Sequence, residues 1–170
     1  MESQNSMPQK EIIDLLNKCW MTHDGMWFFH CLKTLGMEET NRLNKAAIKS
    51  LAPIEIKRLR AILGNEYDPH DVQNFNRFLQ GAARLMIPDF MNLNFDFPDL
   101  NTIIWKANNC FAYVGIKRLG VIDTYECGVL HRIHCWLEAL GIQHQFNPGI
   151  GKYNMHYQGR CEGRITLETI

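Results

Sequence analysis

The chain lacks any long hydrophobic run and any excess of charge. No segment approaches the roughly 18 consecutive apolar residues that a transmembrane helix requires, so the sequence predicts no membrane span. Its 18 Lys and Arg residues balance 18 Asp and Glu residues, which leaves a formal net charge of zero. A protein without net positive charge has no global field that attracts nucleic acid or an anionic membrane. We therefore expect neither of these as a partner.

Common catalytic and cofactor motifs are missing as well. There is no Gly-x-x-x-x-Gly-Lys-Ser/Thr loop, no Gly-x-Gly-x-x-Gly fingerprint and no Gly-x-Ser-x-Gly nucleophile elbow. These absences argue against nucleotide hydrolysis, dinucleotide binding and the serine hydrolase fold. Neither Cys-x-x-Cys nor His-Glu-x-x-His occurs, so no recognised metal-binding spacing is present.

The sequence also shows no export signal. Residues 1–6 are polar and carry neither the basic nor the apolar region of a signal peptide. Six cysteines in a chain without such a signal are more typical of reduced thiols than of disulfides. The sequence therefore predicts a cytoplasmic protein.

What is present is the composition of one globular domain. With 170 residues, of which 46% are hydrophobic and 21% charged, the chain is long enough to bury a core. We predict a single domain over 1–170, helical over 8–87 and mixed strand and helix over 90–170. Helical periodicity predicts helices at about 11–35, 38–51, 54–63 and 68–87, and Pro53 marks either a break or the first turn of the third helix.

The pattern changes in the second half. Apolar and polar residues alternate over 91–97, which predicts a strand, and 102–107 is its predicted hairpin partner. Two helices are predicted at 110–119 and 126–140, and further strands at 142–146, 152–157 and 163–169. The expected fold class is α+β, with an N-terminal helical half packed on a small, mostly antiparallel sheet and one or two helices inserted between strands.

The first predicted helix carries polar residues in an apolar stripe. His23 falls in that stripe, one turn before Trp27, and Asp24 has Trp20 four residues before it and Phe28 four residues after it. Side chains three and four positions apart share a helix face, so both polar residues should point into an aromatic environment. A carboxylate there is costly unless it is paired or hydrogen-bonded. Two interpretations stay open: the floor of a ligand pocket with an acid/base pair, or core polar groups satisfied by a neighbouring helix.

The second predicted helix repeats this feature. Asn41 and Asn44 lie on its inward stripe with Met37, Ile48 and Leu51. Asparagine competes with the backbone for hydrogen bonds in the middle of a helix, so its presence there needs an explanation. Both asparagines are candidate ligand contacts.

Cysteines and histidines gather after residue 109. On the predicted helix at 126–140, Cys127, His131, His134 and Cys135 fall on one face. Thiolate and imidazole are the ligands that zinc prefers, which makes zinc the cofactor to test. Packing of thiols as small apolar groups is the alternative. A third option makes Cys127 a nucleophile, because it lies at a helix N-terminus with His131 one turn away as a base.

The order of motifs resembles a known group of proteins. His-Asp-Gly-x-Trp-Phe occupies 23–28, and Gly-Met-Glu-Glu-Thr-Asn-Arg-Leu-Asn occupies 36–44. They are followed by Cys110, Cys127, Trp136 with Leu140-Gly141, and Cys-x-Gly-x-Ile at 161–165. Together these motifs resemble a family of uncharacterised bacterial and archaeal cytosolic proteins over nearly the whole chain. That family is distantly similar to L-2-amino-thiazoline-4-carboxylate hydrolase, which opens a thiazoline ring to give N-carbamoyl-cysteine.

A more remote similarity is to vinyl-reductase-type sensory domains. These are small α+β modules that bind apolar ligands and often zinc. Tyr153 stands eight residues before Cys161, where their pattern has a cysteine. The chain therefore departs from their zinc site.

Two functional hypotheses follow. The first is a hydrolase that cleaves a C–N or C–S bond of a small polar molecule, with His23, Asp24 and Cys127 as catalytic residues. Its ligand contacts would be Trp20, Trp27, Asn41, Asn44, Cys110, His131 and Cys161. The second is a non-catalytic ligand-binding or sensory module, in which aromatic side chains of the first helix line an apolar cavity. A small molecule is the partner in both, and a homodimer is left open. A third interpretation, in which all these groups are core packing, also stays open.

Overall fold

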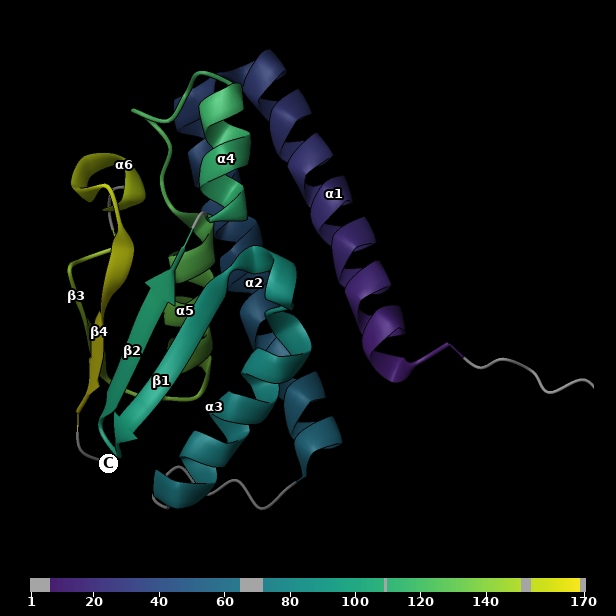
Figure 1. Cartoon of the computed structure of the whole chain (residues 1–170). Coiled ribbons are helices and arrows are strands. Elements are labelled where there is room, and N and C mark those ends of the chain that lie inside the picture. The colour runs from purple at the N-terminus through teal and green to yellow at the C-terminus, as the bar shows by residue number, and fades with distance from the viewer. Residues whose placement is uncertain (1–6, 65–71, 109, 151–153, 169–170) are drawn as a thin grey trace, which may run out of the picture.

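The computed structural model of the chain describes residues 7–64, 72–108, 110–150 and 154–168. The first half holds three helices and a short 3₁₀ helix: α1 (Gln9–Leu35), α2 (Met37–Leu63), α3 (Val72–Met86) and η1 (Asp89–Met91). The second half mixes strands and helices: β1 (Leu93–Asp99), β2 (Thr102–Ala107), α4 (Phe111–Arg118), α5 (Gly128–Ala139), β3 (His144–Asn147), α6 (Asn154–Gln158) and β4 (Cys161–Leu167). This is the predicted α+β fold, with helices inserted between strands (Figure 1).

The strands of the described residues form one four-stranded sheet. Its order is β1-β2-β4-β3, and every pair of neighbours is antiparallel. In the central pair, Trp105 of β2 lies opposite Gly163 of β4. Buried residues alternate along β2, as expected for a strand with one face on the core. The predicted mostly antiparallel sheet is confirmed.

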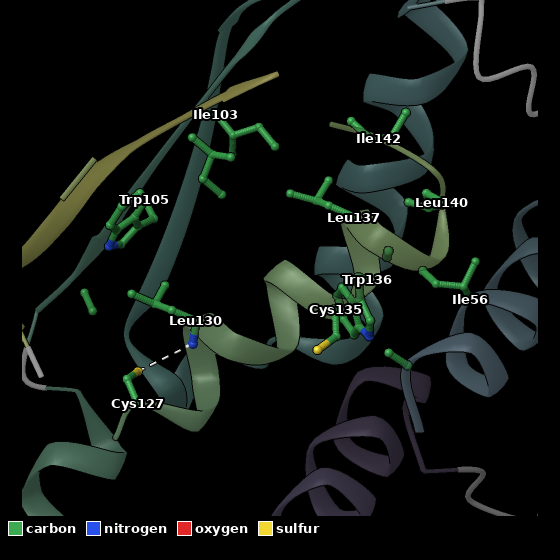
Figure 2. Close-up of a cluster of buried hydrophobic side chains, with 14 of the residues drawn as sticks. Ile56, Ile103, Trp105, Cys127, Leu130, Cys135, Trp136, Leu137, Leu140 and Ile142 are labelled. Carbon is green, nitrogen blue, oxygen red and sulfur yellow. Dashed lines mark hydrogen bonds between the residues drawn. The ribbon is translucent and has the colours of Figure 1, made fainter. Parts of the chain in front are cut away.

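The core lies between this sheet and the helices. α5 packs on α2, and its side chains reach the strands on the other side, as Figure 2 shows for Leu130 and Leu137. Trp105 and Ile165 are fully buried on the sheet face that meets them. α2 contributes Ile56 to the same cluster. Burial of these apolar surfaces is the main source of the fold's stability.

α1 lies at the outside of the molecule. In Figure 1 it runs along one edge of the molecule, and its main described backbone contacts are with α2. Of its 27 residues only Asn17 is buried. The Asn17 side-chain amide donates to the backbone oxygen of Ile13 at 3.0 Å and to that of Leu85 at 3.4 Å. The sequence predicts an inward apolar stripe on this helix, but part of that stripe faces solvent.

Two predicted elements are wrong. The break at Pro53 does not occur, because α2 continues through it from Met37 to Leu63. Ala52 and Ile56 are buried on either side of Pro53, so packing against the core outweighs the lost backbone hydrogen bond. The strand predicted at 152–157 is replaced by α6 from residue 154, and residues 152 and 153 lie outside the described residues. The predicted helix start at 68–69 also lies outside them.

Within the described ranges, none of the helices combines the length and the hydrophobicity that a membrane span needs.

Candidate functional site

An apolar hollow of about 420 Å³ lies between α1, α4 and α5, and we call it the α1–α4–α5 pocket. α2 contributes Asn44 and Ile48 to its wall. Most of the lining is aromatic or aliphatic. Its aromatic side chains are those of Trp20, Phe28, Phe29, Phe111, Tyr125 and Trp136. The volume falls in the range of small-molecule sites, about 300–1,000 Å³, which are also mostly apolar.

A second hollow, of about 940 Å³, lies between the start of α1, the end of α3 and β1. It is larger and more open, and polar residues such as Lys10, Asp14, Asn94 and Asp96 make up about half of its lining. An open depression with this much polar surface holds a mostly apolar small molecule poorly. The smaller apolar pocket is therefore the better candidate site.

Asp24 and Asn44 are polar groups on the wall of the α1–α4–α5 pocket. Asp24 is exposed at the pocket mouth, yet partial burial of its carboxyl raises the pKa, while the nearby charges of Arg132 and His23 oppose that rise. Neither Asp24 nor Asn44 makes a side-chain hydrogen bond to the described part of the protein. Both groups are therefore available to a ligand.

Arg132 supplies the third polar group, and it is held in place by its neighbours. Its Nε donates to Oε2 of Glu55 at 3.0 Å, and a second nitrogen of the guanidinium donates to Oε1. Trp136 also donates to Glu55, from Nε1 to Oε2 at 2.7 Å. The guanidinium lies over the ring of Trp20, with 4.3 Å between its carbon and the ring centroid. This bidentate pair with stacking fixes one wall of the pocket.

Tyr125 and Gly128 set the distance between α5 and the helices beside it. The hydroxyl of Tyr125 accepts a hydrogen bond from the backbone N–H of Gly128 at 3.1 Å, and its ring meets Phe28 edge-on at 5.8 Å. A Cβ at Gly128 would lie 2.9 Å from Nδ2 of Asn44 and 3.3 Å from Ile48. Gly128 therefore lets α2 approach the pocket closely, which places Asn44 at its wall.

Three of the predicted cysteines come together, but beside the pocket. Cys110, Cys127 and Cys161 line a small apolar void of about 10 Å³. Burial raises the pKa of Cys127 to about 12 and that of Cys161 to about 11. The Cys127 sulfur accepts a hydrogen bond from the backbone N–H of Leu130 at 3.5 Å, drawn in Figure 2. At neutral pH the thiols of Cys127 and Cys161 are protonated and packed like small apolar groups.

The histidines of α5 contact Cys135 and His144 instead of Cys127. Nε2 of His131 lies 3.5 Å from the sulfur of Cys135, away from Cys127. Nδ1 of His144 donates to the backbone oxygen of Ile142 at 2.8 Å, so its Nε2 accepts from Nδ1 of His134 at 2.7 Å. No three His, Cys, Asp or Glu side chains among the described residues are arranged to hold a metal ion.

The remaining predicted site residues are dispersed. His23 and Trp27 are exposed on the outer side of α1, so the expectation that His23 points into an aromatic environment is wrong. Asn41 is buried and binds the loop before α5, donating to the backbone oxygen of Thr124 at 2.8 Å and accepting from the N–H of Glu126 at 3.2 Å. Its role is explained by the fold.

Glu55 and Arg132 are the residues that sequence reasoning missed. Glu55 shares a helix face with Ala52 and Leu59, both buried. A carboxylate three and four residues from buried apolar side chains is a sign of a buried ion pair. The sequence contains that sign, but it does not reveal that the partner of Glu55 is Arg132, 77 residues away.

Comparisons with known proteins place the chain in a family. Residues 4–147 match the family model described as "Family of unknown function (DUF6125)". Comparison with the curated proteins and with the solved structures gives no match, so the resemblance to thiazoline-carboxylate hydrolase gains no support from them. Because the match spans most of its length, the chain belongs to DUF6125, a family of unknown function.

Proposed function

We propose that this protein binds a small, mostly apolar molecule that carries an amine, and that it catalyses no reaction on this molecule. The ligand's apolar part would occupy the α1–α4–α5 pocket, and its amine would meet Asp24 at the mouth. The observation that carries this proposal is a polar pair, Asp24 and Asn44, which line an aromatic pocket and make no side-chain hydrogen bond to the described residues.

The charges around the pocket favour an amine over an acid. Arg132 is neutralised by Glu55, which accepts two hydrogen bonds from it. Arg118, the other cation of the lining, is exposed to solvent. The residue Asp24 is exposed as well, but its carboxyl group is partly desolvated, so we assign it as the charge that a ligand pairs. Aromatic rings beside it would add cation–π attraction for an ammonium group.

Binding fits the geometry better than the hydrolysis of C–N or C–S bonds. The residues expected to be catalytic do not share a site, since His23 is exposed on the outer side of α1 and Cys127 lies in a separate void. A thiol whose pKa is about 12 is a poor nucleophile at neutral pH. Of the three residues expected to be catalytic, only Asp24 lines the pocket, and we assign it to ligand recognition.

A matched series of ligands tests the proposal. Calorimetric titration would compare 4-phenylbutylamine, 4-phenylbutanol and 4-phenylbutyrate, which share an apolar part and differ in the head group. We expect the amine to bind most tightly and the carboxylate most weakly. Asp24→Asn should remove the preference for the amine, whereas Asp96→Asn, which removes an exposed carboxylate of β1, should leave it unchanged. Failure of all three to bind, or the same ranking in Asp24→Asn, contradicts the proposal.

A further inference from the structure

α1 carries a second apolar face that the fold leaves uncovered, and we call it the outer stripe of α1. Its members are Ile12, Leu15, Leu16, Met26 and Trp27, which are 42%, 52%, 63%, 55% and 64% exposed. Their helical spacing puts them on the side of the helix away from Asn17 and Phe28, which face the body. The same side holds Cys19 and His23, and both are exposed.

Such a face is unusual on the surface of a monomer. An amphipathic helix turns one apolar side to the core and a charged side to water, whereas a helix that is apolar on both sides is normally covered on both. Contiguous exposed apolar patches mark interaction sites. The outer stripe has no Lys, Arg, Asp or Glu among its members, and it includes Trp27, a residue type that often anchors interfaces.

We infer that a second copy of this chain covers the outer stripe, with the two α1 helices packed antiparallel about a twofold axis. This inference does not rest on the proposed function. The stripe runs from Ile12 to Trp27, so its centre falls next to Cys19. A helix turned end for end about that centre presents a similar row of side chains, as a twofold interface requires.

Charge also favours this occupant and this direction. Glu11 and Lys33 are both exposed, and their separation of 22 residues puts them on the same flank of the stripe, near opposite ends. In an antiparallel pair, Glu11 approaches the partner's Lys33, whereas a parallel pair would leave the two residues at opposite ends of the interface. The net charge of zero means that two copies do not repel each other.

The dimer would also support the pocket. Trp20, Asp24 and Phe28 of α1 line one side of the α1–α4–α5 pocket, although α1 has few buried residues of its own. A partner packed on the outer stripe would press this wall against α4 and α5.

The mass of the purified full chain in solution tests this inference. Sedimentation velocity at micromolar concentration should give twice the chain mass of 19.8 kDa. Leu16→Glu and Trp27→Glu should each halve that mass while the circular dichroism spectrum stays unchanged. The control is Ile62→Glu, which alters an exposed apolar side chain on α2, 72% exposed, and should leave the dimer intact.

Crosslinking keeps the test decisive if a glutamate variant fails to fold. A short bis-maleimide should join two wild-type chains through Cys19, close to the twofold axis, and Cys19→Ser should abolish that product. A wild-type monomer overturns the inference. A monomer is the result expected if a membrane or another protein covers the outer stripe instead of a second copy. A dimer that neither crosslinks at Cys19 nor responds to Leu16→Glu overturns it as well.

Discussion

The guanidinium of Arg132 on α5 stacks on the indole ring of Trp20 on α1, 4.3 Å from the ring centroid. The same guanidinium is paired with Glu55 of α2. One side chain therefore ties together three helices around the pocket, and one of its partners, Trp20, lines the pocket.

Replacing Arg132 with Leu is expected to lower the free energy of unfolding by about 3–5 kcal/mol, because the Glu55 carboxylate would stay buried without its cation. The Glu55 side chain is only 7% exposed, so water cannot replace the lost partner. Urea unfolding followed by circular dichroism measures the change.

The double variant Glu55→Gln/Arg132→Leu removes the buried charge and should recover part of the loss. Arg42→Leu is the matched control, since Arg42 pairs with Glu39 on an exposed surface and should change stability little. Equal losses in the Arg132 and Arg42 variants would show that the buried pair does not hold the helices.

Gly163→Ala should destabilise the sheet. A Cβ at this position would lie 2.3 Å and 2.4 Å from two ring atoms of Trp105 and 2.6 Å from the backbone oxygen of Asn147. The tryptophan is fully buried and the oxygen belongs to the backbone, so neither can move aside easily. Overpacking of this kind costs about 1–3 kcal/mol in free energy of unfolding. Gly149→Ala, where the added Cβ meets no atom within 4 Å, is the control, and equal stability of the two variants would refute the packing argument.

Alkaline pH should weaken the fold partly through Cys127. The unfolded chain loses this thiol proton near the ordinary pKa of 9.0, whereas the folded chain keeps it up to about 12. The folded state thus binds more protons in this window, so stability present below pH 9 is lost as the pH rises. Cys127→Ala should make the decline shallower, by up to about 1.4 kcal/mol per pH unit. Cys19→Ala, at an exposed position, should leave the slope as in the wild type, and an unchanged slope in Cys127→Ala would argue against a buried neutral thiol.

Asp24→Asn should raise the melting temperature at neutral pH. Burial raises the pKa of Asp24 above 3.8, which means that the folded state disfavours its charged form. The stability linked to this group is present below pH 3.8 and is lost as the pH rises through the folded-state pKa. The gain from Asp24→Asn should therefore be largest at neutral pH and vanish in acid. A lower melting temperature at neutral pH would show that the carboxylate is satisfied within the protein and is not reserved for a ligand.

The fold class and most elements could be predicted because they follow from local periodicity. The alternation over residues 91–97 gave β1, and the apolar pattern over 126–140 gave α5. The break at Pro53 could not be judged in this way, since α2 is held by its packing on α5. The short alternation at 152–157 is too brief to separate a strand from the single helical turn of α6.

The site was predictable only in part. The spacing around Asp24 correctly indicated aromatic neighbours, because residues four apart on a helix share a face. The same spacing failed for His23, since α1 is apolar on two sides and periodicity does not tell which side meets the core. The pairing of Arg132 with Glu55 depends on contacts between helices far apart in the sequence.

Binding of N-phenyl-1-naphthylamine, an uncharged aromatic dye whose fluorescence rises in apolar surroundings, tests most directly whether the α1–α4–α5 pocket holds an apolar ligand. Gly115 lines this pocket, and a Cβ there meets no atom within 4 Å, so Gly115→Phe should fill the space without disturbing α4. Lys117→Phe adds the same ring to the exposed face of that helix as a control. We expect saturable fluorescence with the wild type and Lys117→Phe, and its loss in Gly115→Phe. No saturable signal with the wild type, or an equal signal in Gly115→Phe, would contradict ligand binding in this pocket.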